Sequence, residues 1–137
     1  MAKLVVAVAL CSLFGLVVGI GQMVGAPIPA GVNEECVQRA LVYAMQQYNK
    51  GTNDMYLSKV MEVTSAKKQV VSGYNIMIQA VISRTMCKKP MTDYAQCAVH
   101  TEPHLAQTLT CEFTVYVVPW TGERKLTKQE CGNGDFQ

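Results

Sequence analysis

The sequence predicts an α+β domain in which one long helix packs across an antiparallel β-sheet. Residues 33–51 carry apolar side chains at helical spacing, and no other stretch does so convincingly. Most of the chain after residue 56 shows the alternation of apolar and polar residues that is typical of half-buried strands. A helix with an apolar stripe and a sheet with one apolar face can bury each other, which gives two packed layers.

Residues 1–21 are typical of a secretory signal peptide. Lys3 precedes an uncharged, strongly apolar stretch that runs to about Val18, and small residues follow at Gly19 and Gly21. A membrane anchor is the alternative, because residues 4–21 are barely long enough to span a bilayer. Their three glycines and the missing basic flank favour cleavage near residues 19–21. We therefore expect a secreted, extracellular protein with a single domain over residues 22–137.

The composition of the mature chain excludes some classes of partner. Without Lys3 it has 11 basic and 10 acidic residues, because the full chain has 12 and 10. No basic block stands out, so we expect no nucleic-acid partner and no membrane partner. There is no Asn-x-Ser/Thr sequon, so N-glycosylation is not expected.

The N-terminal part of the mature domain is predicted to be extended and then helical. Residues 22–33 contain two prolines and two glycines, which disfavour a helix. Asn33 is expected to cap the helix, whose first turn holds Glu34 and Glu35, and Gly51 is expected to end it. The residues at steps of three and four that form its apolar face are Val37, Ala40, Leu41, Ala44, Met45 and Tyr48.

The remainder is predicted to consist of strands. Residues 57–71 are rich in Val and Thr, and the pair Val60-Met61 breaks their alternation, which indicates a bulge. A short last strand is predicted over about residues 124–131, whereas residues 88–107 have no clear period and read as a long excursion. The apolar members of the two alternating strands that start near residues 74 and 108 are Ile76, Ile78, Ala80 and Ile82, and Leu109, Cys111, Phe113, Val115 and Val117.

The cysteines limit which parts of the chain can be joined by disulfides. Five remain after the signal, and in an oxidising compartment the last four are natural disulfide partners. Several pairings are open, of which the simplest joins neighbours, Cys87 to Cys97 and Cys111 to Cys131. Each bridge would contribute about 3 kcal/mol by constraining the unfolded chain. Cys36 is left over and expected to be unpaired, in a mostly monomeric protein for which a dimer through Cys36 is an alternative.

Turns at residues 69–73 and 119–122 fall at the same end of the predicted sheet, because successive antiparallel strands reverse direction. The excursion at residues 88–107 falls at the other end. Each apolar residue at the first end has an ordinary explanation: Trp120 could be a core residue, and Val70 and Val71 could be sheet residues near a turn. Together with the extended N-terminal segment, however, they place three apolar pieces along one edge, which indicates an interaction site.

These segments resemble the cystatins. Gln69-Val70-Val71-Ser72-Gly73 matches the Q-x-V-x-G signature of that family, and Pro119-Trp120 matches its second hairpin. A signal peptide before Gly25, one helix, and cysteines placed 10 and 20 positions apart complete the pattern of a secreted type 2 cystatin. The resemblance covers essentially the whole mature chain. It implies a cystatin fold, in which a long helix is gripped by a curved antiparallel sheet of about five strands, with the disulfides Cys87–Cys97 and Cys111–Cys131.

The resemblance also implies a function, which is reversible, competitive inhibition of papain-like cysteine proteases of the cathepsin type. In the family, three segments form a wedge that fills the protease cleft, and none of their side chains needs to react. The burial partner of Val70 and Val71 would then be another protein. The protease-binding residues implied for this chain are Val24, Gly25, Ala26, Gln69, Val70, Val71, Ser72, Gly73, Pro119 and Trp120. Two features depart from the family pattern, namely Cys36 and the tail at residues 132–137.

A second site is predicted in the loop that follows the helix. Thr52-Asn53-Asp54 resembles the Ser-Asn-Asp loop with which some type 2 cystatins inhibit legumain, an asparagine-specific endopeptidase, with Thr52 in place of serine. An ordinary turn is the alternative, because Asn and Asp are common turn residues. The loop leads into the strand that ends at Gln69, so it is expected at the opposite end of the sheet from the wedge.

Other functions are less well supported. Cys97-x-x-His100-x-x-x-His104 superficially resembles a zinc cluster, but Cys97 is expected to be oxidised. A thiol enzyme built on Cys36 lacks an identifiable oxyanion or orienting group. We therefore expect no enzyme, no metal and no cofactor. The remaining alternative is a secreted binding module with the cystatin fold that does not inhibit proteases.

Overall fold

The computed structural model describes residues 25–91 and 94–133. The predicted signal peptide (residues 1–21), Val24 and the end of the tail (residues 134–137) lie outside the described residues. Within the described residues, no helix has both the length and the apolar character that a membrane span requires.

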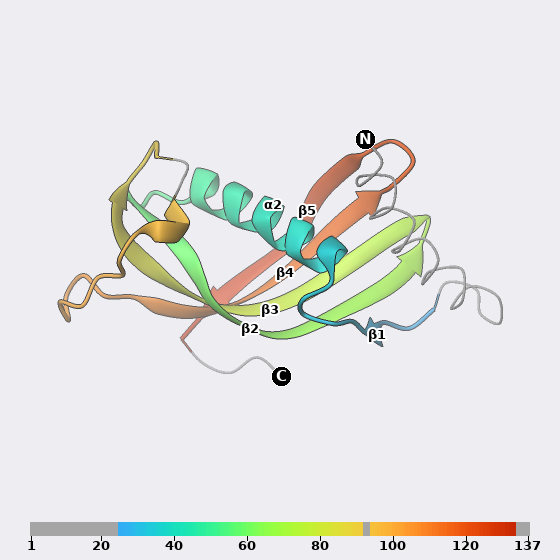
Figure 1. The fold of residues 1–137 in the computed structure, drawn as a ribbon, viewed down its shortest axis with the longest axis horizontal. Helices are drawn as coiled ribbons and strands as arrows, with labels where there is room; N and C mark the ends of the chain where they lie inside the picture. The colour runs from blue at the N-terminus through green and yellow to red at the C-terminus, as the bar shows by residue number, and fades with distance from the viewer. Residues whose placement is uncertain (1–24, 92–93, 134–137) are drawn as a thin grey trace.

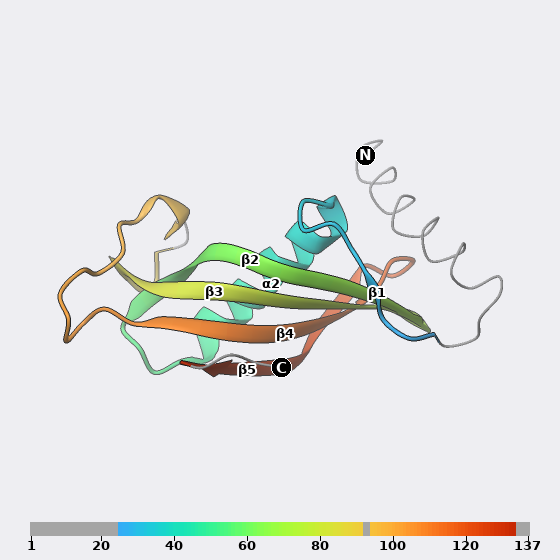
Figure 2. The same cartoon turned by 90° about the horizontal axis from the view of Figure 1, so that it is seen from below.

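The predicted α+β architecture is confirmed. One helix lies across one face of a curved five-stranded antiparallel sheet (Figure 1), and the view from below shows the strands in front of the helix (Figure 2). Each strand pairs with its neighbour in chain order, so the sheet order is β1-β2-β3-β4-β5. The elements are β1 (Ile28–Pro29), α2 (Glu35–Gly51), β2 (Tyr56–Val71), β3 (Gly73–Lys88), the 3-10 turn η1 (Tyr94–Gln96), β4 (Thr108–Val118) and β5 (Glu123–Gly132).

The apolar face predicted for the helix is the buried face of α2. All six predicted side chains are buried, and Asn49 is buried with them. Asn49 exchanges two hydrogen bonds with the backbone of Ser58: its Nδ2 donates to the Ser58 carbonyl at 3.0 Å, and its Oδ1 accepts from the Ser58 N–H at 2.9 Å. These bonds satisfy a buried amide and fix the end of α2 to β2.

The predicted end of the helix at Gly51 is confirmed, whereas the predicted N-cap was wrong by one residue. The N-cap is Glu34, because Asn33 lies inside a turn that the Glu34 N–H closes on the Gly31 carbonyl at 3.1 Å. The Glu34 side chain accepts a hydrogen bond from the Gly31 N–H at 2.6 Å, which reinforces this turn. At the other end Gly51 is the last helical residue, and Thr52 is the C-cap, whose N–H donates to the Tyr48 carbonyl at 3.1 Å.

The alternation predicted for the central strands is confirmed by burial. Ile76, Ile78, Ala80 and Ile82 of β3 are buried, as are Cys111, Phe113 and Val115 of β4. Leu109 and Val117 are partly buried and pack against the same core. The helix closes this core from above, where the Tyr48 ring meets the Phe113 ring edge-on at 6.2 Å.

The predicted bulge is also present. The register of β2 against β3 shifts between Val60 and Glu62, which leaves Met61 outside the ladder and 49% exposed. Two further shifts, between Tyr56 and Ser58 and between Val63 and Ser65, were not predicted. Bulges bend a strand and increase its twist, so they let the long β2 and β3 curve around the helix.

Two disulfides join described residues to each other, Cys87–Cys97 and Cys111–Cys131, as the resemblance implied. Cys111 and Cys131 are opposite each other in β4 and β5. The prediction for Cys36 was wrong: it is disulfide-bonded in this structure, and the described residues contain no free cysteine. Cys36 therefore offers no free thiol for the dimer that was the alternative to a mostly monomeric protein.

Candidate functional site

One end of the sheet brings together three segments that are far apart in the sequence. The β2–β3 hairpin turns at Ser72, and Tyr74 beyond that turn is paired with Val117 of β4. Because β4 ends at Val118, the β4–β5 turn follows directly beside the first hairpin, on the right in Figure 1. The N-terminal segment runs along the edge of β2 to the same end. We call residues 25–26, 69–73 and 119–120 the three-segment edge.

Hydrogen bonds along β2 hold the N-terminal segment. Ile28 and Pro29 pair with Lys68 and Lys67, and the Ala30 N–H donates to the Ala66 carbonyl at 2.9 Å. Further out, the Gln69 side chain donates from Nε2 to the Gly25 carbonyl at 3.0 Å. Gly25 is buried and Ala26 is exposed. The segment therefore lies beside the first hairpin from its first described residue.

The first hairpin has a very tight tip. Val71 and Gly73 are paired, so Ser72 alone lies between the two strands, and it is exposed. Gly73 has φ +108°, and a Cβ there would lie 2.6 Å from the Val117 carbonyl oxygen, so only glycine fits. Val70 and Val71 are half-buried, and Val70 also packs against the core. Each of the two valine side chains is therefore partly packed inside the protein and partly accessible to solvent.

The second hairpin presents the tryptophan. The Val118 carbonyl accepts from the N–H groups of Thr121 at 3.2 Å and Gly122 at 2.8 Å, and Gly122 has φ +77°. Trp120 is 71% exposed, which is the largest exposed fraction among the exposed large hydrophobic side chains of the described residues. The alternative in which Trp120 is a core residue is therefore excluded.

Lys68 lies behind the first hairpin and was missed at the level of sequence. Its side chain is only 1% exposed and faces the start of α2. Its Nζ lies 3.5 Å from Glu34 Oε1, 3.8 Å from Cys36 Sγ and 5.9 Å from the centre of the Tyr74 ring. Burial lowers the pKa of Lys68, and the Glu34 carboxylate opposes that change. The sequence did contain an indication that Lys68 is buried, because strand alternation puts residue 68 on the same face as Ala66.

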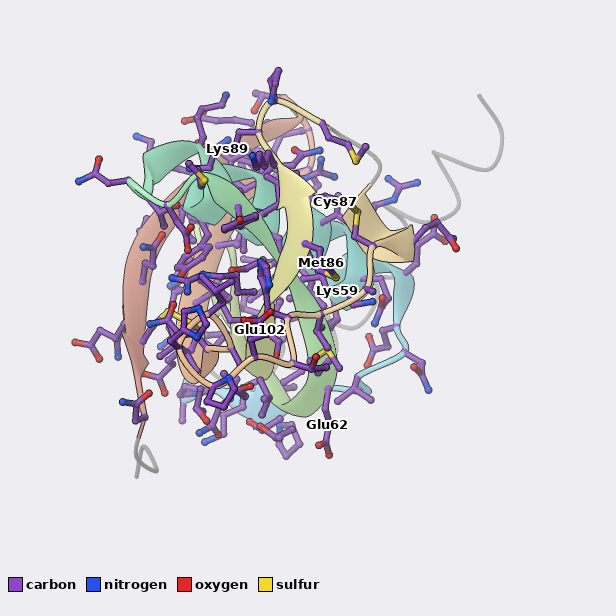
Figure 3. The ribbon with its side chains drawn as sticks, turned by 90° about the vertical axis from the view of Figure 1, so that its left-hand side faces the viewer. Lys59, Glu62, Met86, Cys87, Lys89 and Glu102 are labelled. Carbon is purple, nitrogen blue, oxygen red and sulfur yellow. A yellow bond between two sulfur atoms is a disulfide. The ribbon has the colours of Figure 1, made fainter. Side chains whose placement is uncertain are left out.

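The loop predicted as a second site lies at the opposite end of the sheet, where Tyr56 pairs with Lys88. Figure 3 views this end and labels Lys89, whose Nζ donates to the Thr52 carbonyl at 2.8 Å and to Thr52 Oγ1 at 3.0 Å. Asp54 accepts from the Tyr56 N–H at 3.0 Å and from Arg84 Nε at 2.7 Å. Asn53 is exposed between these two anchored neighbours.

The structure offers little for metal chemistry. Cys97 is bonded to Cys87 and cannot act as a thiolate ligand, and the His100 ring packs edge-on against Tyr56 at 4.4 Å. Across residues 25–91 and 94–133, no three His, Cys, Asp or Glu side chains are grouped so that they could hold a metal ion.

Known proteins resemble this chain in both sequence and fold. The family model described as the cystatin domain matches residues 25–120. The chain is 45% identical over 112 residues to cystatin-C of Mus musculus, covering 82% of this chain and 80% of the mouse protein. It is 44% identical over 113 residues to a cystatin of Coturnix japonica, covering 82% and 97%. The crystal structure of dimeric human cystatin F is similar with a TM-score of 0.73 at 32% identity, covering 85% and 93%. The chain belongs to the cystatin family and is a type 2 cystatin.

Proposed function

We propose that this protein is a reversible, non-covalent, competitive inhibitor of papain-like cysteine proteases that blocks the active-site cleft with its three-segment edge. Membership of the cystatin family supports cysteine protease inhibition in general. The observation that carries the wedge mechanism is the exposure of Trp120, at 71%, beside the half-buried Val70 and Val71 at one end of the sheet. Exposed aromatic side chains next to apolar neighbours are common anchors of protein interfaces.

The rigidity of the edge supports tight binding. The first hairpin has a one-residue tip, and the second is closed by two hydrogen bonds to the Val118 carbonyl. The N-terminal segment is bonded to β2 and to Gln69. Segments that are already ordered lose little conformational freedom on docking, which favours affinity. None of the edge side chains needs to react, so the mechanism is occlusion of the cleft.

The protein is further proposed to act outside the cell, as a mostly monomeric protein whose signal peptide, residues 1–21, is removed on secretion. The support is the sequence pattern of that segment. N-terminal sequencing of protein collected from the culture medium tests it. A mature N-terminus upstream of residue 19, or retention of the chain in the cell, would contradict it.

Titration of papain with the secreted protein tests the main proposal. Inhibition should be competitive with substrate and reversed by dilution, and the inhibitor should be recovered uncut. Stable covalent attachment would contradict the occlusion mechanism. Absence of inhibition would favour the alternative, a cystatin-fold binding module that does not inhibit proteases.

Legumain inhibition is proposed as a second function of the loop at residues 52–54. The observation that favours it is the exposure of Asn53 between Thr52 and Asp54, whose side chains are held by Lys89 and Arg84. An asparagine-specific protease needs an accessible asparagine amide, and a fixed loop presents one without ordering cost. Because the loop and the three-segment edge lie at opposite ends of the sheet, one molecule could hold both enzymes. Titrating legumain with the papain complex tests this.

A further inference from the structure

A row of polar side chains crosses the sheet directly behind the three-segment edge. Gln69 of β2 pairs with Asn75 of β3, which in turn pairs with Tyr116 of β4. Their chain neighbours Lys68, Tyr74, Ile76 and Val115 are buried. Since successive residues of a strand point to opposite faces, the polar row lies on the face away from α2.

The Gln69 amide lies between the Gly25 carbonyl and the Asn75 side chain and is hydrogen-bonded to both. The Gly25 carbonyl can only accept a hydrogen bond, so Gln69 must turn its NH₂ group toward it, as the 3.0 Å contact shows. Gln69 Oε1 then faces β3 and accepts from Asn75 Nδ2 at 3.2 Å. Asn75 Nδ2 is thus the donor to Gln69 Oε1, and a carboxylate at residue 75 could not donate to that oxygen. Asn75 therefore acts on Gly25 through Gln69.

Tyr116 supports the tip of the first hairpin. Its hydroxyl donates a hydrogen bond to the Ser72 carbonyl, the backbone group at the turn itself. Its ring also lies against Gly73, since a Cβ at that glycine would be 3.2 Å from Tyr116 Cε1. Tyr116 thus joins the first hairpin to β4, two residues before β4 ends and the Trp120 turn begins.

We propose that Asn75 and Tyr116 are positioning residues of the three-segment edge. Asn75 holds the N-terminal segment in place through the Gln69 amide, and Tyr116 holds the Ser72 carbonyl and sets the first hairpin against the second. This inference rests on the proposed inhibition of papain-like proteases. It adds two residues that act on that site from the sheet face that points away from α2.

The test uses Asn75→Asp and Tyr116→Phe, each with a matched control. Asn33→Asp places the same new charge at an exposed turn before α2. Tyr43→Phe removes another tyrosine hydroxyl that donates to a backbone carbonyl, that of Arg124 at 3.1 Å. Two quantities are measured: hydrogen–deuterium exchange of residues 25–31 and 69–74 in the free protein, and the dissociation rate of the papain complex.

Asn75→Asp should accelerate exchange in residues 25–31 and raise the dissociation rate about tenfold, because a carboxylate cannot donate to Gln69 Oε1 and repels that oxygen. Tyr116→Phe should accelerate exchange in residues 69–74 and raise the dissociation rate about fivefold. Both controls should stay within about twofold of the unmutated protein. In a Gln69→Ala background, Asn75→Asp should have little further effect, since it acts through Gln69.

The failures of the two proposals are distinguishable. If the unmutated protein inhibits papain and both variants dissociate at its rate, the positioning inference is overturned while the proposed function stands. If the unmutated protein does not inhibit papain, the proposed function fails. Hydrogen–deuterium exchange then tests whether Asn75 and Tyr116 hold the two segments in place. Unchanged exchange in both variants overturns that role, and faster exchange confined to residues 25–31 and 69–74 supports it.

Discussion

Gln69 and Gly25 are 44 residues apart in the chain and are joined by a 3.0 Å hydrogen bond from the Gln69 amide to the Gly25 carbonyl. The bond adds a third attachment to those made by β1 and by Ala30, and it is the one nearest the hairpin tip. Gly25 is thereby held beside the motif that contains Gln69. The N-terminal segment and the first hairpin thus form one continuous surface in this structure.

Trp120→Ala should weaken inhibition of papain without weakening the fold. The side chain is 71% exposed, so its loss should change the free energy of unfolding by less than about 0.5 kcal/mol. Loss of an aromatic interface anchor typically costs about 2 kcal/mol or more, which corresponds to dissociation about 30-fold faster. Stopped-flow kinetics and thermal unfolding measure the two effects. The control is Met86→Ala at the other end of the sheet, where another large apolar side chain is 58% exposed. Equal effects of the two variants on dissociation would remove Trp120 from the site.

Asn53→Lys should abolish inhibition of legumain and leave inhibition of papain unchanged. A lysine cannot present the amide that an asparagine-specific pocket accepts, whereas the hydrogen bonds of Thr52 and Asp54 should survive the change. Inhibition constants for both enzymes provide the measurement. If the unmutated protein does not inhibit legumain, or if Asn53→Lys inhibits it equally well, the second site does not exist.

Gly73→Ala should destabilise the protein and disturb the first hairpin. Its φ of +108° is unfavourable for alanine, and the new Cβ would lie 2.6 Å from the Val117 carbonyl oxygen. We expect a loss of about 1–3 kcal/mol in the free energy of unfolding, together with faster dissociation from papain. The matched control is Gly51→Ala, where a Cβ meets nothing within 4 Å and helix propensity should add up to about 0.5 kcal/mol. Denaturant titration should give effects of opposite sign, and the same loss at both glycines would contradict this account of Gly73.

Lys68 should make stability rise with pH in the alkaline range. Burial lowers its pKa in the folded protein below the ordinary value of 10.5 that it regains on unfolding. Between those two pKa values the unfolded chain binds more protons, so the free energy of unfolding rises with pH and the cost of burying the charge is removed.

Denaturant titrations of the unmutated protein and Lys68→Met from about pH 8 upward isolate this contribution, because the other titrating groups are shared. The unmutated protein should gain stability relative to the variant as the pH rises. Parallel curves would show that the Lys68 pKa is not lowered.

Local patterns in the sequence were sufficient to predict α2 and the strands β2 to β5, but not the short β1 and η1. The apolar face of α2 and the buried series in β3 and β4 follow from steps of 3.6 and 2 residues, which depend on backbone geometry alone. The bulge at Met61 was visible because it breaks such a step. The two hairpin turns of the three-segment edge could be brought to one end by counting strand reversals, and the motif at residues 69–73 indicated which family uses them. The N-cap of the helix was missed because a turn between Gly31 and Glu34 outweighs the capping preference of Asn33.

Only the tertiary structure decided how the side chains behind the edge are used. From sequence alone Lys68 is one of two adjacent lysines in a strand, yet the packing of α2 against β2 places it among the most buried side chains of the described residues. Asn75 and Tyr116 are ordinary polar members of alternating strands until the register sets them beside Gln69 and under Ser72. Alternation determines which face of a strand a residue occupies. It carries no information about which residue of the next strand lies opposite, because that register depends on bulges, turns and packing spread over the whole sheet.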